Sequence, residues 1–259
     1  MIKIENVQVT GWEAAIRGMR NPMNSWNRSD SFCLATDKCS ECADNFHCGF
    51  YFSEAGQGEP YRNRFPGDIH HIGDNDQSLM NRLVKAGTDH RKFMRMIAVY
   101  VDITAPLYWW KEFDTYKVGT VANSCSTMHK IADKEFTLED FSYENLIDEY
   151  NLCDICTDEY DGPNNPKDVL KLIIDMLNKA RQLYLETKDK KYWWQMIQLL
   201  PSSYNQRRTI MMNYEVLANI YKSRKNHKLD EWRAFCKWVE TLPYAEIITG
   251  IYDGNKREE

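Results

Sequence analysis

The stretch from Leu200 to Trp232 constrains the fold of this chain most strongly, because an apolar period runs along it beside several polar side chains. Apolar and aromatic residues recur there at the spacing i, i+4, i+7 and i+11, which is the helical period of a face turned toward a core. These residues are Ile210, Tyr214, Leu217 and Tyr221. We therefore predict one long helix over this stretch, followed by a turn and a second helix.

A line of basic and amide side chains accompanies that face. Asn213, Arg224 and His227 lie within about one quadrant of a neighbouring helical face, since successive residues advance by roughly 100°. Arg207 stands at the start of the same predicted helix. Half-buried polar groups must find partners, and a basic line that carries amides needs anionic or amide-like ones. The alternative is a helix with a few solvated charges and a capped end.

The order of these residues after a Leu-Pro pair resembles the C-terminal helix of the flavin-dependent thymidylate synthases. The matching residues are Arg207, Asn213, Leu217, Asn219 and Arg224. In that family the asparagines contact the flavin, and the arginine that closes the helix binds the nucleotide and is needed for catalysis. The resemblance implies that Arg224 is both catalytic and substrate-binding, and that Arg207 helps to bind the phosphate. Asn213 and Asn219 would hold the isoalloxazine ring, and His227 is assigned to the cofactor as well.

A second match begins at Leu83, in LVKAGTDHRKF and, further on, VYVDITAPLYWWKEFDTYKVGTVANSCST. The family has there a helix ending in Lys-x-Gly, a strand ending in Ala-Pro, and the signature Arg-His-Arg, seven residues, Ser. The signature positions of this chain hold Thr115, Tyr116, Lys117 and Cys125, so one basic charge remains. A lysine replaces an arginine as a point charge but cannot form its bidentate fork.

The resemblance also assigns roles around this second match. The loop after Lys117 has small residues that let a backbone approach a ligand, and polar donors that suit a phosphate or a pyrimidine edge. The substrate-binding residues implied there are Asn123, Ser124, Cys125 and Ser126. The family's reaction needs no enzyme nucleophile, so Cys125 is not given that role. His90, Arg95 and Lys117 are assigned to the flavin phosphates, and a solvated basic turn is the alternative for the first two.

The chemistry implied by the resemblance is reductive methylation of a nucleotide. Bound FAD, reduced by NADPH, would serve the transfer of a one-carbon unit from methylenetetrahydrofolate to C5 of dUMP. The family is a homotetramer whose sites lie at subunit junctions. Two alternatives stay open: a diverged enzyme that alkylates or hydroxymethylates another pyrimidine nucleotide, and a non-catalytic flavin- or nucleotide-binding protein.

Together with the resemblance, the remaining elements predict an α/β (α+β) protein with the fold of that family, helix-rich with a small central sheet and a long inserted loop, in a single domain over residues 1–259. Strands are expected at 2–10 and 96–104, the second of them central because it is rich in Val and Ile without a breaker. The aromatic stripe after Pro106 favours core over a cofactor contact. Further helices are expected at 12–20, 76–86, 107–117, 163–188, 190–200, 228–240 and 244–251. The range 137–150 is expected to form a capped acidic helix or two short ones.

Residues 21–76 lack a sustained period and predict an irregular inserted loop. Four cysteines lie in it with the spacing C-x5-C-x2-C-x5-C, namely Cys33, Cys39, Cys42 and Cys48. Four thiolates suit zinc or an iron–sulfur cluster, whereas free thiols are the alternative, and no residue is assigned to a metal. A second C-x2-C at Cys153 and Cys156 lies among carboxylates, which disfavour the thiolate that redox chemistry needs.

Composition limits the partners and the compartment. A formal net charge of -5 gives no basic field, so we expect no nucleic-acid partner. The resemblance implies a small-molecule nucleotide as the ligand. No apolar run reaches the ~18 residues of a membrane span, and the start lacks the apolar core of a signal peptide. Eight cysteines without such a signal predict reduced thiols and a cytoplasmic location, away from the membrane.

Overall fold

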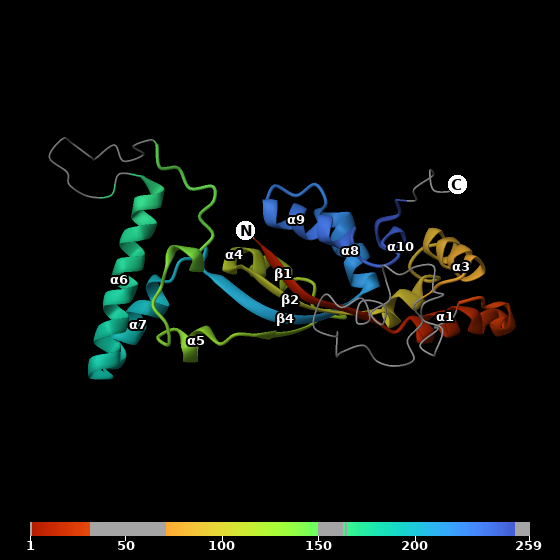
Figure 1. Cartoon of the computed structure of the whole chain (residues 1–259), viewed down its shortest axis with the longest axis horizontal. Coiled ribbons are helices and arrows are strands. Elements are labelled where there is room, and N and C mark those ends of the chain that lie inside the picture. Colours follow the sequence, from red (N-terminus) through yellow and green to blue (C-terminus); the bar gives the residue numbers. More distant parts are fainter. Residues whose placement is uncertain (1, 32–70, 150–162, 164, 252–259) are drawn as a thin grey trace, which may run out of the picture. The chain divides into compact units, whose positions relative to one another are not determined.

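The computed structural model describes residues 2–31, 71–149, 163 and 165–251 of the chain (Figure 1). Within these residues, helices accompany a four-stranded antiparallel sheet whose strands follow the order β1-β2-β4-β3. The strands are β1 (Lys3–Thr10), β2 (Ala98–Pro106), β3 (Val121–Ser124) and β4 (Asn205–Asn213). This architecture confirms the predicted α+β class, helix-rich with a small central sheet.

The chain divides into two compact units. The first comprises Met1–Glu5, Asp102–Thr115 and Ala122–Thr209. The second comprises Asn6–Val101, Tyr116–Val121 and Ile210–Glu259. The single domain over residues 1–259 stays a prediction. Most of the predicted insertion lies outside the described residues, and with it the cysteines at 33, 39, 42, 48, 153 and 156.

The two predicted strands are confirmed. In β2 the side chains of Val99, Val101 and Ile103 are all but fully buried while those between them are more exposed, which is the period of two that a strand produces. Its place between β1 and β4 confirms that it is an inner strand. The opening strand β1 contains one irregularity at Asn6, whose φ of 53° is a conformation that asparagine tolerates better than most residues.

The predicted long helix is wrong in its first part, because residues 205–213 form strand β4. Ile210 and Met212 are buried and Thr209 is exposed, so this segment alternates with a period of two. An i, i+4 spacing from Ile210 to Tyr214 fits both a helical period and an even strand period, so the spacing alone does not distinguish them. Arg207 therefore lies on a strand. The helix begins at Tyr214, and the predicted turn and second helix follow it.

The first unit contains α4 (Leu107–Phe113), α5 (Thr127–Lys130), α6 (Pro166–Thr187) and α7 (Lys190–Leu199). Helix α6 begins where the side chain of Asn165 accepts a hydrogen bond from the amide of Asp168 at 2.9 Å, with Pro166 in the first position. Helices α6 and α7 pack side by side (Figure 1), and Leu177 and Met196 are fully buried in their shared core.

Two other predictions for this unit have opposite outcomes. Trp109, Trp110 and Phe113 of α4 are buried, which confirms that the aromatic stripe belongs to the core. The helix predicted over 137–150 is wrong, because the described part of that range holds only the 3-10 turn Leu138–Asp140. Phe141 follows in extended conformation and forms a β-bridge with Tyr204, and its burial takes precedence over the local helical preference.

The second unit contains α1 (Trp12–Arg20), α3 (Asp74–Lys85), α8 (Tyr214–Arg224), α9 (Asp230–Val239) and α10 (Glu246–Thr249). Short 3-10 helices lie at Asn21–Met23, Trp26–Arg28 and Lys92–Met96. Trp12 packs edge-on against Tyr214 and Tyr244, with both pairs of ring centroids 5.3 Å apart. The predicted apolar face of α9 is buried, which confirms this amphipathic helix.

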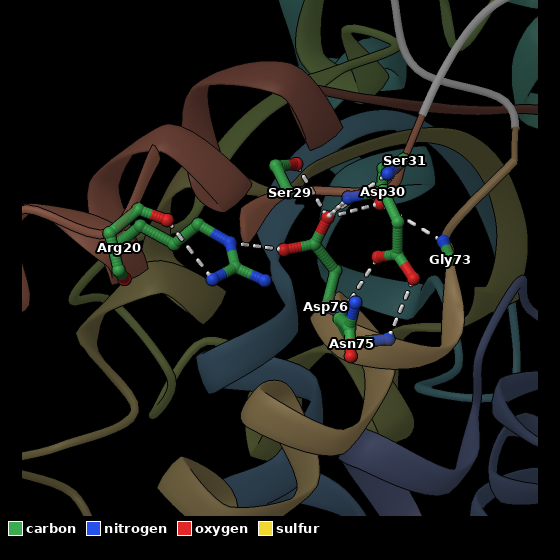
Figure 2. A network of polar contacts seen from close by, with 8 residues as sticks. Arg20, Ser29, Asp30, Ser31, Gly73, Asn75 and Asp76 are labelled. Carbon is green, nitrogen blue, oxygen red and sulfur yellow. Dashed lines mark hydrogen bonds and ion pairs between the residues drawn. The ribbon is translucent and has the colours of Figure 1, made fainter. Parts of the chain in front are cut away.

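A buried polar network joins the end of α1 to the start of α3 within this unit (Figure 2). Arg20 Nε donates to Asp76 Oδ1 at 2.6 Å, and both side chains are almost fully buried. Asp76 also accepts hydrogen bonds from the hydroxyl groups of Ser29 and Ser31, both at 2.6 Å. Asp30 in turn accepts from the amides of residues 75 and 76, so it caps the first turn of α3 from outside the helix.

The environment of Asp76 keeps its carboxylate charged. Burial by itself raises the pKa of this group. The hydrogen bonds from Ser29 and Ser31 and the ion pair with Arg20 outweigh that effect, so the pKa of Asp76 lies below its ordinary value of 3.8. The folded state therefore favours the ionised form more than the unfolded state does, and the pair contributes stability wherever Asp76 is ionised.

Replacing Asp76 by asparagine should destabilise the fold. The substitution Asp76→Asn leaves the buried guanidinium of Arg20 without its counter-charge, and breaking a buried pair in this way costs about 3 kcal/mol or more. The free energy of unfolding in urea is the measurement. Asp74→Asn is the matched control, because it removes the same charge from the same helical turn at an exposed position.

The pH dependence of stability gives a second readout. The contribution of Asp76 is complete above the unfolded pKa of about 3.9 and is lost as the pH falls through the lower folded pKa. Below about pH 4 the urea midpoint of the unaltered protein should therefore fall more steeply than that of Asp76→Asn. Equal slopes for the two proteins would rule out Asp76 as the titrating group.

Candidate functional site

Helix α8 positions two of the predicted site residues at its ends. Asn213 has an extended backbone, and its side chain accepts a hydrogen bond from the amide of Val216 at 3.0 Å, which starts the helix. Leu217 and Ile220 are fully buried on the inner face. Arg224 follows them by seven and four residues, so it emerges from the inner face at the last helical position.

The guanidinium of Arg224 lies among aromatic rings of the second unit. Its Nε donates to the hydroxyl oxygen of Tyr116 at 2.9 Å. Its central carbon lies 4.7 Å from the ring centre of Trp232 and 5.7 Å from that of Tyr116, within the range of cation–π attraction. Its Nη1 lies 2.9 Å from Nε2 of His227, which stands in the turn after the helix. The structure thus brings Arg224 and His227 together, as the shared helical line predicted.

The loop Tyr116–Val121 contacts both ends of α8. Tyr116 reaches Arg224 at the end of the helix. Gly119 has φ 79°, and a Cβ added there would lie 3.0 Å from Asn213 Nδ2 and 3.1 Å from a methyl group of Val216. Glycine is therefore required at this position both by the backbone conformation and by the approach to the start of the helix. Lys117 lies in the same loop with an exposed side chain.

The predicted basic turn before β2 separates into two parts. Arg91 forms an ion pair with Glu215 of α8, with Nε 2.9 Å from a carboxylate oxygen, so this cation serves the packing of the helix. His90, Lys92 and Arg95 are exposed. In the part of the chain that the structure describes, none of these three is paired with a carboxylate. Their side chains are accessible to an anionic ligand.

The predicted substrate residues of the first unit lie on β3, on the turn after it and on β4. Arg207 is about half exposed, and its Nη2 is bonded to Asp102 at 2.7 Å. The amide of Cys125 donates to the carbonyl oxygen of Arg207 at 3.0 Å. Asn123 and Ser124 are exposed on β3, as is Cys125 after it. The hydroxyl of Ser126 caps α5 by accepting from the amide of residue 129 at 3.2 Å.

Not every predicted residue joins a cluster. The side chains of His90, Arg95 and Asn219 are exposed. Sequence reasoning did not assign to the site two residues that contact Arg224, namely Tyr116 and Trp232. Tyr116 stands at the position of the signature histidine, which is a signal that sequence reasoning had in hand. Trp232 was predicted only as part of the core, and its complete burial agrees with that role as well.

Metal and redox chemistry find no further support in this part of the chain. Among the described residues, no group of three or more His, Cys, Asp or Glu side chains is placed to hold a metal ion. Burial raises the pKa of the Cys236 thiol to about 11, so it stays protonated and unreactive. None of the helices in the described ranges has the length and apolar character needed to cross a membrane.

Comparison with known proteins relates this chain to nucleotide-methylating enzymes through its fold. No protein-family model and no curated protein sequence matches it. Thymidylate synthase X from Helicobacter pylori, solved with FAD and dUMP, aligns with a TM-score of 0.58 over 96% of this chain and 97% of its own, at 14% identity. A second structure of that enzyme with the same ligands gives 0.56 over 95% and 97%, at 14% identity. The UMP/dUMP methylase PolB from Streptomyces cacaoi, bound with 5-Br dUMP, gives 0.51 over 97% and 96%, at 12% identity.

The two asparagines assigned to the flavin should differ in their effect on stability. Asn213→Ala removes the helix cap and should cost about 1 kcal/mol of unfolding free energy. Asn219→Ala changes an exposed position within α8, where alanine is the better helix former, and should cost nothing. Urea unfolding of both variants makes the comparison. A stable Asn213→Ala protein would show that the cap is dispensable.

Proposed function

Because the chain has the fold of the flavin-dependent thymidylate synthases, we propose that it is an enzyme of that kind. The proposed reaction is reductive methylation of dUMP at C5 in the cytoplasm, with methylenetetrahydrofolate as the one-carbon donor, NADPH as the reductant and FAD as the bound cofactor. The observation that carries this proposal is the fixed guanidinium of Arg224 at the end of α8. It occupies the position at which the sequence resemblance expects the arginine that binds the nucleotide.

Arg224 is the proposed catalytic residue and grips the pyrimidine. Hydrogen bonds from a guanidinium to a carbonyl oxygen are strengthened by charge, and they strengthen further as negative charge develops on the ring. The contacts that Tyr116 and Trp232 make with Arg224 orient it without neutralising it, since a phenol and an indole are uncharged.

The exposed donors of the first unit are the proposed partners for the rest of the nucleotide. Asn123 and Ser124, with the neighbouring Cys125 and Ser126, offer side-chain and backbone donors of the kind that bind phosphate and sugar oxygens. Arg207 is the proposed phosphate ligand. Its present bond to Asp102 would then have to be shared with the phosphate or exchanged for it.

The residues assigned to FAD fit that cofactor in their chemistry. Arg95 and Lys117 are exposed cations without a carboxylate partner in the described structure, and His90 is an exposed imidazole. All three can donate hydrogen bonds to phosphate oxygens. Asn213 uses its oxygen for the helix cap, which leaves its amide hydrogens as donors, and Asn219 is exposed on the same helix. When bound, FAD would accept a hydride from NADPH and deliver it during methyl transfer.

A second candidate function is methylation or other alkylation of a different pyrimidine nucleotide. PolB, which shares the fold, is described as a UMP/dUMP methylase, so this fold accommodates more than one nucleotide. Lys117 in place of a signature arginine removes one bidentate fork and favours a change in how the nucleotide is held. A protein that binds flavin and nucleotide without turnover is the remaining alternative, and the experiments below separate the three.

A homotetramer is the proposed assembly. On α6, Val169, Leu172 and Met176 are 42%, 45% and 52% exposed and share one side at the spacing i, i+3 and i+7. An exposed apolar stripe of this kind favours a partner surface. Light scattering should give four times the mass of the chain, and Met176→Glu should shift the mass to smaller species. Lys171→Glu, exposed on a different face of the same helix, is the control for an added negative charge. A monomeric unaltered protein would contradict this assembly.

The proposed function predicts a coloured protein whose spectrum responds to the nucleotide. After incubation with FAD, the purified protein should retain flavin absorption, and dUMP should shift the bands. Arg224→Ala should keep the flavin and weaken dUMP binding by about 10- to 100-fold, since it removes charged hydrogen bonds worth roughly 1.5–3 kcal/mol. Lys222→Ala is the matched control, an exposed cation in the same helical turn.

Three outcomes distinguish the candidate functions. Release of tritium from 5-tritiated dUMP in the presence of NADPH and methylenetetrahydrofolate supports thymidylate synthesis. Release of tritium from 5-tritiated UMP but not from dUMP supports the second candidate. Binding of flavin and nucleotide without any release of tritium supports the non-catalytic alternative. A protein that takes up no FAD contradicts the proposal, as does an Arg224→Ala variant with full activity.

A further inference from the structure

We propose that Gln206 is a positioning residue for the nucleotide, because its side-chain amide holds the turn at residues 125–127 in place. This inference rests on the proposed function, since that turn carries residues proposed to bind the substrate. Gln206 is half-buried on β4 and belongs to the first unit, as the turn does. Neither the sequence pattern nor the resemblance assigned it a role.

The turn depends on polar contacts for its position. Strand β3, which leads into it, is an edge strand whose four residues are all exposed, so burial of apolar surface does little to hold it. The backbone amide of Cys125 donates to the carbonyl oxygen of Arg207 at 3.0 Å. Nε2 of Gln206 adds two hydrogen bonds, to the carbonyl oxygen of Cys125 and to the hydroxyl of Thr127, both at 3.0 Å. These contacts fix the chain on both sides of Ser126.

The partners of Gln206 determine which way its amide points. Nε of Arg208 donates to Oε1 of Gln206 at 3.0 Å, and this nitrogen can only donate. The carbonyl oxygen of Cys125 can only accept, so it requires the Nε2 end of the amide. A reversed amide would place two acceptors together at Cys125 and two donors together at Arg208. Both hydrogens of Nε2 are therefore committed to the turn.

Arg208 is itself fixed by the core of the first unit. Its Nη1 is bonded to Asp114 at 2.7 Å, and its guanidinium carbon lies 4.2 Å from the ring centre of Trp110. Trp110 is buried, and its indole N–H donates to the backbone carbonyl oxygen of Gln206 at 2.9 Å. The backbone and the side chain of Gln206 are thus both ordered before a ligand binds. A turn that is ordered in advance loses less conformational entropy on binding, which increases its affinity.

The competing interpretation is that Gln206 serves only the packing of Arg208. Two replacements of similar size separate these roles. Gln206→Glu keeps an acceptor for Arg208 and strengthens that contact by charge, but it has no N–H group for the turn. Gln206→Met removes the donors and the acceptor and adds no charge. Positioning of the turn predicts that both replacements weaken nucleotide binding, whereas packing of Arg208 alone predicts that glutamate is harmless.

The first measurement is the affinity for dUMP, determined by calorimetric titration. We expect the dissociation constant to rise about tenfold in both Gln206 variants, because each loses two hydrogen bonds that hold a ligand-binding turn. The dissociation constant for FAD should be unchanged, since the turn is not assigned to the cofactor. Gln195→Glu and Gln195→Met are the matched controls, exposed on α7 in the same unit, and they should leave dUMP binding unaltered.

Cys125 offers a second readout at the turn itself. Its thiol is exposed, so bound dUMP should slow its alkylation by iodoacetamide. Mass spectrometry of the peptide that contains Cys125 distinguishes it from the other cysteines of the chain. Both Gln206 variants should require about tenfold more dUMP than the unaltered protein for the same protection.

Three outcomes overturn this inference alone while the unaltered protein still binds dUMP. One is unchanged dUMP binding by Gln206→Glu, which assigns the residue to the packing of Arg208. Another is a loss confined to Gln206→Glu, which indicates repulsion by the added charge. The third is an equal loss of dUMP and FAD binding in both variants, which indicates general disruption of the fold. Failure of the unaltered protein to bind dUMP overturns the proposed function together with this inference.

Discussion

The second unit depends on the burial of helix α8 on nearly every side. Most of its residues from Tyr214 to Tyr221 are buried, so each polar group on it must have a partner. Glu215 pairs with Arg91, and the hydroxyl of Tyr214 donates to a carbonyl oxygen at 2.6 Å. Burial, together with a hydrogen bond to Glu240, raises the pKa of Tyr221 to about 12. The candidate site residues of the helix therefore lie at its two ends, Asn213 and Arg224, and at Asn219, which is exposed between them.

Sequence periodicity predicted most helices of the described structure but not the start of this central stretch. Helices α1, α6 and α9 carry apolar residues over several turns, and a long repeat distinguishes a period of 3.6 from a period of two. Strand β4 offers too few apolar residues for that distinction, and its pairing with β2 and β3 is a property of the whole sheet. A range of nine residues cannot carry this tertiary information by itself.

The candidate site was predictable where one element carries it. Arg224 and His227 lie three residues apart, so local geometry brings them together as predicted. The contact of Arg224 with Tyr116 joins residues 108 positions apart, and only the fold brings that pair together. For the same reason the sequence did not show which cation of the basic turn before β2 is paired. Arg91 pairs with Glu215, which lies 124 positions away in the sequence. The resemblance indicated the arginine, whereas the side chains that orient it came from the structure.

The network around Asp76 also has a consequence for how this protein changes over evolution. The amide of Gly73 donates to the hydroxyl of Ser31 at 3.1 Å although the two residues are 42 positions apart. This hydrogen bond therefore connects two positions of the second unit that are far apart in the sequence. Doubling the number of residues between two such anchors costs only about 0.6 kcal/mol of closure entropy. As far as closure entropy is concerned, a change in the number of residues between Ser31 and Gly73 therefore alters the stability of this contact by little.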